Sequence, residues 1–353
     1  MNRRSRNENL REIRTEALTV ATERGPVWPG ISKRETHSMV PTIDHWTGQS
    51  ETIRRFKVAL EAAWNDSTVL PHMLFVGGPG LGKTLLAHLA GKEMGVAVHE
   101  RLAQVVGTMG AMNGLLLQAG EKEIVFLDEI HELPPPVQTV LYRAMEGQQI
   151  SVQARGSQTM TMPLKNFTVV GATTDEFKLL SPLRDRFKMI LPFVEYDAES
   201  LAVITRQRAQ LLGLNLEESV AYEIARRSKG TPRLAVRLLE SCHRYSRSKG
   251  DDQITMEHFE RTVLLDGLDV LGLGPDEQRY IRFLADRNGE PVRLFTIESG
   301  IAIHRRTIQT VIEPFLVRMN LIERSSQGRA ITHKGLRHLG LIGEPETTLA
   351  EDE

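Results

Sequence analysis

The residues whose types and spacing suggest chemistry most directly form a glycine-rich segment from Gly77 to Thr84, with the sequence GGPGLGKT. It fits the pattern G-x-x-x-x-G-K-[ST], in which glycines let successive backbone N–H groups converge on phosphate oxygens. The helix that it is expected to open adds partial positive charge at its N-terminus. Lys83 would reach the β- and γ-phosphates, and the Thr84 hydroxyl would ligate Mg²⁺. The segment predicts a nucleotide-binding site.

Two acidic residues could make such a site hydrolytic. Hydrolysis needs a carboxylate that organises the metal and a group that activates water. Asp128 and Glu129 directly follow an apolar run and supply both. We expect Asp128 to hold the Mg²⁺ shell and Glu129 to polarise the attacking water. His131, two residues further on, could respond to the nucleotide, but we expect a structural role for it.

Three short apolar runs predict the strands that position these groups. They cover residues 73–76, 124–127 and 167–170, and each ends in polar residues. Such runs are typical of buried parallel strands, whose carboxyl ends meet at one edge of a sheet. Helical periodicity predicts helices over 50–64 and 83–94. We therefore predict an α/β domain with a parallel sheet and a site at the strands' carboxyl ends.

From residue 197 the pattern becomes helical. Four segments have helical periodicity, and they cover 197–212, 217–228, 231–248 and 255–265. Short helices follow from about residue 274, and a hairpin is expected from 321 to 332 with Gln327-Gly328 at its turn. We predict five parts, which are a polar N-terminal tail (1–38), a large α/β domain (39–196), a small helical domain (197–272), a C-terminal domain (273–340) and an acidic tail (341–353).

Composition excludes several classes of protein. The chain has 353 residues, 44 Lys and Arg against 45 Asp and Glu, and one cysteine, Cys242. A single cysteine excludes a disulfide framework or a multi-cysteine metal site within one chain. No segment approaches the roughly 18 apolar residues that a membrane span needs. Because no apolar core of a secretory signal follows the N-terminal arginines, we expect a cytoplasmic protein with no membrane partner.

A basic segment stands out in this nearly neutral chain. Residues 300–340 contain seven Lys or Arg and two Glu. A helix and a hairpin with arginines near its turn suit contacts with DNA phosphates, which position a protein without reading sequence. Few aromatic residues lie among these charges, so single-strand stacking is not indicated. The alternative is a solvated basic face.

The order of these motifs resembles that of the AAA+ ATPases, and more closely that of the RuvB family of Holliday-junction branch-migration motors. The likeness covers about residues 45–340, and the segments after 220 discriminate best because the ATPase signatures occur in every AAA+ branch. The segments that carry it are GPGLGKT (78–84), FLDEIH (126–131), LYRAME (141–146), GATT (171–174), SPLRDRF (181–187), EIARRSKGTPRLAVRLL (223–239), LGLGPDEQR (271–279), TIQTVIEPFL (307–316) and GRAITHKGLRHLG (328–340).

The resemblance implies an AAA+ P-loop NTPase domain with a parallel sheet, then a small all-α lid domain and a C-terminal winged-helix domain. It implies an ATP hydrolase that uses ATP and Mg²⁺ to translocate double-stranded DNA. The expected function is helicase-type branch migration of four-way Holliday junctions in homologous recombination and DNA repair. The resemblance also implies a homo-oligomer, in this family a hexameric ring, that acts with RuvA.

The resemblance also assigns residues by position. Thr174 is similar to the sensor that contacts the γ-phosphate or the water. Arg186 is similar to the arginine finger that reaches a neighbouring subunit's nucleotide, with Arg184 as the fallback and a surface salt bridge with Asp185 as the alternative for both. Arg233 matches the second sensor. The expected ATP-binding residues are Gly80, Leu81, Gly82, Lys83, Thr84, Leu85, Glu146, Tyr196 (in the adenine pocket) and Arg233, and the expected DNA contacts are Arg305, Arg324 and Arg329.

Three segments depart from the family pattern. Met39-Val40 stands where the family has Arg-Pro, and residues 102–120 lack its Gly-Pro and Gly-Asp-Leu signature. Residues 147–166, which should form the hairpin that grips RuvA, are shorter and have a polar centre. These departures motivate a second hypothesis, a RuvB-like paralogue whose motor serves another partner or DNA structure. A third is a nucleotide-dependent assembly switch with little turnover, against which the intact Asp128, Glu129 and Arg186 speak.

Overall fold

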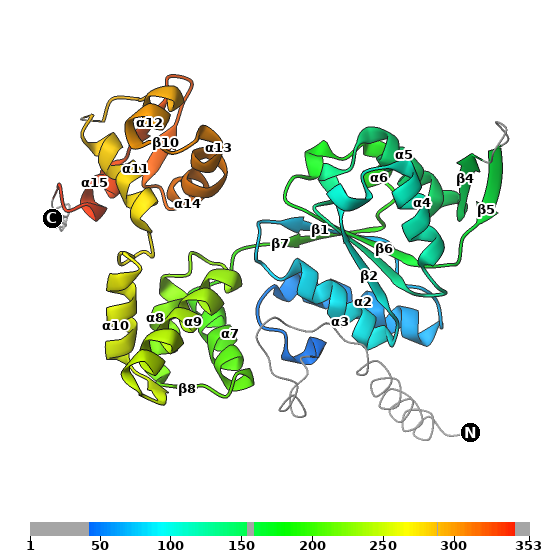
Figure 1. Ribbon diagram of the computed structural model, residues 1–353, viewed down its shortest axis with the longest axis horizontal. Helices are drawn as coiled ribbons and strands as arrows, with labels where there is room; N and C mark the ends of the chain where they lie inside the picture. Colours follow the sequence, from blue (N-terminus) through cyan, green and yellow to red (C-terminus); the bar gives the residue numbers. More distant parts are fainter. Residues whose placement is uncertain (1–41, 154–158, 288, 343–353) are drawn as a thin grey trace, which may run out of the picture. The chain divides into compact units, whose positions relative to one another are not determined.

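The computed structural model describes residues 42–153, 159–287 and 289–342 (Figure 1). The chain divides into two compact units. Among the described residues, the first unit comprises 42–214 and 230–236, and the second comprises 215–229 and 237–342. The predicted N-terminal tail, Met39-Val40, the centre of the 147–166 hairpin and nearly all of the acidic tail lie outside the described residues.

A five-stranded parallel sheet in the order β2-β3-β6-β1-β7 forms the centre of the first unit. Its strands are β1 (Met73–Gly77), β2 (Val98–Leu102), β3 (Ile124–Asp128), β6 (Thr168–Thr173) and β7 (Met189–Phe193). The predicted parallel α/β sheet is confirmed, and β1, β3 and β6 are the three predicted strands. The edge strands β2 and β7 were not predicted, because β2 has polar residues at its centre and Pro192 interrupts β7. Proline is tolerated on an edge strand.

Helices cover both faces of this sheet (Figure 1). The helices α2 (Ser50–Asn65) and α3 (Lys83–Met94) lie on one face, and α4 (Met109–Gln118), α5 (Pro135–Gly147) and α6 (Ser181–Arg184) lie on the other. The core on the second face packs Met112 and Leu141 against Val125 and Val169 of the central strands. Burial on both faces explains why the central strands are continuous apolar runs.

Several shorter elements complete the first unit. The 3₁₀ turns are η2 (Ile43–His45), η3 (Ala103–Val106), η4 (Ile130–Glu132) and η5 (Glu176–Lys178). The predicted 147–166 hairpin is present in its described residues, as β4 (Gln149–Gln153) paired antiparallel with β5 (Thr159–Pro163). The helix α7 (Ala198–Leu211), which we predicted at the start of the lid domain, belongs to this first unit. The predicted domain boundaries stay predictions.

The second unit contains the remaining predicted helices, α8 (Glu218–Arg226), most of α9 (Pro232–Lys249) and α10 (Met256–Leu265). A two-residue parallel pair, β8 (Asn215–Leu216) with β9 (Gln253–Ile254), is too short to have been predicted. The C-terminal part follows as α11 (Pro275–Ala285), α12 (Leu294–Ile301), α13 (Arg305–Thr307), the π turn η6 (Ile308–Ile312), α14 (Glu313–Arg318), the hairpin β10 (Ile322–Arg324) with β11 (Arg329–Ile331), and α15 (His333–His338). The hairpin predicted over 321–332 is confirmed.

No helix in the described part of the chain has the length and apolar composition needed to span a bilayer.

A half-buried histidine directly before β1 makes the stability of the first unit depend on pH. The Val169 N–H donates to His72 Nδ1 at 2.9 Å. Burial, and secondly the charge of Lys188, lower the pKa of His72 from 6.5 to about 4. The unfolded chain therefore binds this proton at a higher pH than the folded chain. We expect the free energy of unfolding to decrease from pH 6.5 to pH 4, by up to about 1.4 kcal/mol per pH unit.

Urea denaturation of the wild type and of His72→Asn between pH 4 and 8 measures this effect. The asparagine amide oxygen can accept the same backbone hydrogen bond without titrating. The difference between the two proteins should be constant above pH 6.5 and change below it. A difference that stays constant down to pH 4 would contradict the assignment to His72.

Candidate nucleotide site and nucleic-acid interface

The phosphate loop joins β1 to α3 in the first unit. Gly80 and Gly82 have φ angles of +78° and +104°, a left-handed region that favours glycine. Lys83 begins α3, and its Nζ donates to the carbonyl oxygens of Gly77 and Gly78, both at 2.7 Å. The loop therefore curls around the lysine ammonium and holds it at the carboxyl end of β1.

Two carboxylates lie close to this ammonium. Burial lowers the pKa of Lys83, and the charges of Glu129 and Asp128 raise it. Burial, and secondly the charge of Glu129, raise the pKa of Asp128. These mutual effects mean that the lysine and both carboxylates share one partly desolvated region. The structure thus brings Lys83 together with two adjacent carboxylates that lie 45 and 46 positions further along the chain, as the predicted sheet required.

The tips of β3 and β6 meet at this region. Asp128 ends β3, and its Oδ1 accepts from the Glu129 N–H at 3.1 Å. Glu129 has a φ of +50°, which is unusual for a residue with a side chain. Thr174 directly follows β6, and its Oγ1 donates to Glu129 Oε2 at 3.3 Å. The predicted sensor and the predicted water-activating carboxylate are therefore in contact.

The donor set suits Mg²⁺ bound together with a nucleotide. The described residues contain no cluster of three or more His, Cys, Asp or Glu side chains that could hold a metal. Mg²⁺ bound with a nucleotide takes one or two carboxylates, and phosphates and waters complete its shell. Asp128, partly buried beside the phosphate loop, matches this requirement, and Thr84 in the first turn of α3 would add its hydroxyl.

Aromatic side chains pack against the phosphate loop. The Tyr196 hydroxyl donates to the Leu81 carbonyl at 3.1 Å, and burial raises the pKa of Tyr196 to about 12. A Cβ on Gly48 would lie 2.5 Å from the Tyr196 ring, so this glycine permits the close contact. Trp46 also packs on Gly82, with its ring 3.0 Å from where a Cβ would lie. We did not predict Trp46; its only signal was an aromatic residue two positions before Gly48.

Arg233 lies directly on the phosphate loop. Its backbone N–H donates to the Gly80 carbonyl at 3.4 Å, and its Cβ is 2.7 Å from where a Cβ on Gly80 would lie. Burial lowers the pKa of Lys83, and the charge of Arg233 adds to this effect. Cations that converge on glycine-rich backbone form a site for an anion. The predicted second sensor is therefore at the predicted nucleotide site.

The two finger candidates make ion pairs within the chain. Arg186 Nη2 lies 2.7 Å from Glu146 Oε1, and Arg184 Nη2 lies 3.2 Å from Glu176 Oε2. The alternative predicted ion pairs with Asp185. Ion pairs are present, but the partners are Glu146 on α5 and Glu176 on η5. A nucleotide contact by Glu146, like one by the half-buried Leu85 on α3, stays a prediction.

The predicted DNA-contacting arginines lie in the second unit. Arg305 begins α13 and is exposed. Arg324 and Arg329 lie opposite each other on β10 and β11, with side chains 48% and 14% exposed. Arg329 Nε donates to the fully buried Glu313 Oε1 at 2.8 Å. Arg329 therefore faces inward and is the least accessible of the three arginines, and its contact with DNA stays a prediction.

Because both hairpin arginines lie near the buried Glu313 but at different distances, we expect their substitutions to affect stability and DNA binding differently. The Tyr280 hydroxyl also donates to Glu313 Oε1, at 2.9 Å, and Arg324 Nε lies 3.4 Å from Oε2. Arg329→Ala removes the closest cation from a buried carboxylate and should lower the free energy of unfolding by on the order of 3 kcal/mol. Arg324→Ala should leave stability nearly unchanged but weaken binding to all duplexes alike.

Salt titrations of duplex binding, together with urea denaturation, distinguish the two variants. Loss of one phosphate contact should reduce the slope of log K against log salt by about 0.9 in Arg324→Ala. The matched variant Arg329→Ala should keep most of the wild-type slope at temperatures where it is folded. An unchanged slope in Arg324→Ala would place the DNA contacts elsewhere.

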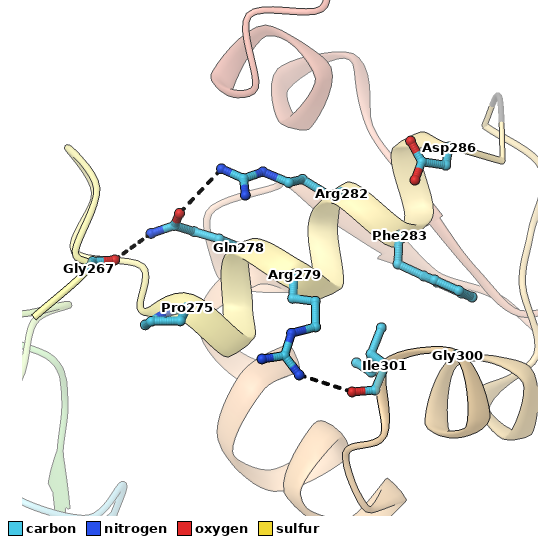
Figure 2. Close-up of a pocket in the computed structure, with 9 residues that line it drawn as sticks. All are labelled: Gly267, Pro275, Gln278, Arg279, Arg282, Phe283, Asp286, Gly300 and Ile301. Atoms are coloured by element: carbon cyan, nitrogen blue, oxygen red, sulfur yellow. Dashed lines mark hydrogen bonds between the residues drawn. The ribbon is translucent and has the colours of Figure 1, made fainter.

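A pocket of about 480 Å³ also lies in the second unit, along α11 (Figure 2). Its arginines point to protein groups (Figure 2): Arg279 Nη1 donates to the Ile301 carbonyl at 3.2 Å, and Arg282 Nη2 to Gln278 Oε1 at 3.5 Å. The Gln278 amide donates in turn to the Gly267 carbonyl at 2.8 Å. These contacts connect the elements around α11, and we assign no ligand to the pocket.

Family models match most of the chain. The model of the Holliday junction DNA helicase RuvB P-loop domain matches residues 40–193, that of the RuvB AAA lid domain 196–270, and that of the RuvB C-terminal winged helix domain 270–340.

Solved structures of RuvB from Thermotoga maritima are also similar. A single-residue mutant matches with a TM-score of 0.77 and 31% identity, covering 87% of this chain and 100% of that chain. The structure described as the T. maritima RuvB Holliday junction branch migration motor matches with a TM-score of 0.75 and 31% identity, covering 86% of this chain and 98% of that chain.

Proposed function

Because this chain belongs to the RuvB family, we propose that it is an ATP-driven motor that moves double-stranded DNA and drives branch migration at Holliday junctions in homologous recombination and DNA repair. One observation carries the proposal: two cations and two carboxylates converge on one phosphate loop. The Lys83 ammonium donates to the carbonyl oxygens of Gly77 and Gly78, and the Arg233 N–H donates to the carbonyl oxygen of Gly80. Asp128 and Glu129 lie at the end of β3, and while burial lowers the pKa of Lys83, their charges raise it. The phosphates of a bound triphosphate would face the two cations, and its divalent cation would face the carboxylates.

Each side chain then has a role in hydrolysis. Lys83 and Arg233 bind the phosphates, and Glu129 orients and polarises the attacking water. Thr174, whose hydroxyl donates to Glu129 at 3.3 Å, lies beside that water. Thr84 and Asp128 would hold Mg²⁺, which when bound with ATP neutralises part of the charge on the phosphates.

The proposal includes partners that match the family. Arg186, with 38% of its side chain exposed, would complete the site of an adjacent copy of the chain in a hexameric ring. A RuvA-like protein would contact the β4–β5 hairpin, where the exposed Met160 and Met162 support a protein contact. The exposed Arg305 and Arg324 support duplex binding by the second unit. The cytoplasmic location predicted from the sequence stays a prediction.

Branch migration of a synthetic four-way junction, with and without a RuvA protein, tests the proposal directly. We expect ATP-dependent conversion of the junction to two duplexes, which RuvA accelerates. Lys83→Ala should abolish it, and Lys92→Ala, which alters the last turn of the same helix, should not. Junctions that stay intact while the protein hydrolyses ATP would contradict branch migration as its function.

One observation favours the paralogue as a second candidate. The 102–120 segment, which lacks the family signature, exposes Leu102, Val105 and Met109. Exposed apolar side chains close together in sequence can mark a contact with another protein. A pull-down with RuvA that recovers nothing, while DNA-stimulated ATP turnover persists, would favour a motor with a different partner.

A further inference from the structure

His131 ends the segment FLDEIH (126–131), and the proposed function gives it no role, unlike Asp128 and Glu129. It lies in η4, two positions after Glu129, and only 7% of its side chain is exposed. Both ring nitrogens face polar groups of the motif and of the neighbouring strand. The role of this imidazole therefore depends on which groups its two ring nitrogens contact.

The ring joins two strand tips. His131 Nδ1 lies 3.0 Å from Thr173 Oγ1, at the end of β6, and 3.3 Å from Glu129 Oε2. On the other side, Nε2 lies 3.2 Å from Glu132 Oε1. Thr173 is fully buried, and its Oγ1 also accepts the Asp175 N–H at 2.9 Å. The Thr173 hydroxyl is therefore held firmly on the β6 side of the ring.

Glu129 needs such support because regular structure does not fix it. Its φ of +50° places it in a left-handed conformation between β3 and η4. His131 and Thr174 both contact the same carboxylate oxygen, Oε2, at 3.3 Å. Contacts from two directions on one oxygen restrict rotation of the carboxylate and leave Oε1 as the oxygen that can accept from water.

We propose that His131 is a positioning residue that holds the Glu129 carboxylate in its hydrolytic orientation and couples it to Thr173 and Thr174 at the tip of β6. A change at the β6 tip would then reach Glu129 through the imidazole ring. The inference rests on the proposed role of Glu129 in ATP hydrolysis. His131 acts through Glu129 and does not itself bind nucleotide.

Two substitutions distinguish the contacts of Nδ1 from those of Nε2. Asparagine places its amide where Nδ1 lies, within reach of Glu129 and Thr173, whereas glutamine extends its amide toward the Nε2 position and Glu132. We expect His131→Asn to keep kcat within about threefold of the wild type. His131→Gln and His131→Ala should lose roughly 10- to 100-fold, the range in which misplaced catalytic groups reduce rates. Affinity for a fluorescent ATP analogue should stay within about threefold in all three variants.

Glu132→Gln is the matched control, because it changes the partner of Nε2 and leaves the Nδ1 contacts in place. It should keep kcat within about threefold of the wild type. Equal losses of kcat in His131→Asn and His131→Ala would overturn the proposal. So would an unchanged kcat in His131→Ala, or losses that follow the fraction of unfolded protein in thermal denaturation.

Glu129→Gln separates this inference from the proposed function. If Glu129→Gln hydrolyses ATP at the wild-type rate, the proposed function itself fails. If Glu129→Gln is inactive while His131→Ala is fully active, only the positioning role of His131 is overturned. Loss of activity in both, with rescue by asparagine at position 131, supports both.

Discussion

Replacing Glu129 with glutamine should abolish ATP turnover while ATP still binds. The amide has nearly the same shape as the carboxylate, and its oxygen can still accept from the Thr174 hydroxyl. It has no negative charge with which to polarise water, and loss of such a group reduces rates by roughly 10²- to 10⁴-fold. The charge of Glu129 raises the pKa of Asp128, so its removal should favour ionised Asp128. We expect the variant to bind ATP with Mg²⁺ at least as tightly as the wild type.

Steady-state phosphate release with duplex DNA, together with equilibrium binding of a fluorescent ATP analogue, measures the two effects. Glu132→Gln serves as the control, because it neutralises a carboxylate in the short 3₁₀ turn that directly follows Glu129. Its turnover should remain near that of the wild type. Normal ATP turnover in Glu129→Gln would contradict the assignment of Glu129 to hydrolysis and would favour the assembly-switch hypothesis.

Replacing Arg186 with alanine should reduce ATP turnover by roughly 10³- to 10⁵-fold, the range measured for arginine fingers. The fold should tolerate the change, because the ion pair with Glu146 at 2.7 Å joins two partly exposed side chains. Such pairs contribute roughly 0–1 kcal/mol. For the same reason Arg186 can leave Glu146 for a phosphate on an adjacent copy of the chain at little cost.

Mixing experiments test whether this arginine acts between subunits. An Arg186→Ala subunit keeps an intact phosphate loop, and a Lys83→Ala subunit keeps an intact finger. Mixed rings would therefore contain some complete sites, and turnover should rise above that of either protein alone. The absence of any rise at every mixing ratio would contradict a trans-acting finger at position 186.

Arg184→Ala is the companion variant. Arg184 pairs with Glu176 at 3.2 Å, so it loses a comparable ion pair when it is replaced. We expect it to keep most of its turnover. If Arg184→Ala were inactive and rescued by mixing, while Arg186→Ala stayed active, the finger would be the fallback residue.

The phosphate loop, the acidic pair and the three central strands could be predicted from the sequence because each depends on contiguous residues. A loop that binds phosphate needs glycines at fixed neighbouring positions, and Gly80 and Gly82 take up left-handed conformations that favour glycine. A strand buried on both faces must be apolar throughout, as β3 is. The edge strand β2 escaped prediction because its polar centre removes that signal.

The sequence by itself thus determined the types of chemistry that this protein can perform, since local backbone geometry and residue type decide them. Only the tertiary structure decided which distant groups meet. Trp46 on Gly82 and His131 between two strand tips both depend on strand order and packing. The inward Arg329 shows the physical reason. A charged side chain pairs with an opposite charge that the fold buries nearby, here Glu313, and the spacing of residues in the sequence does not predict which pair forms.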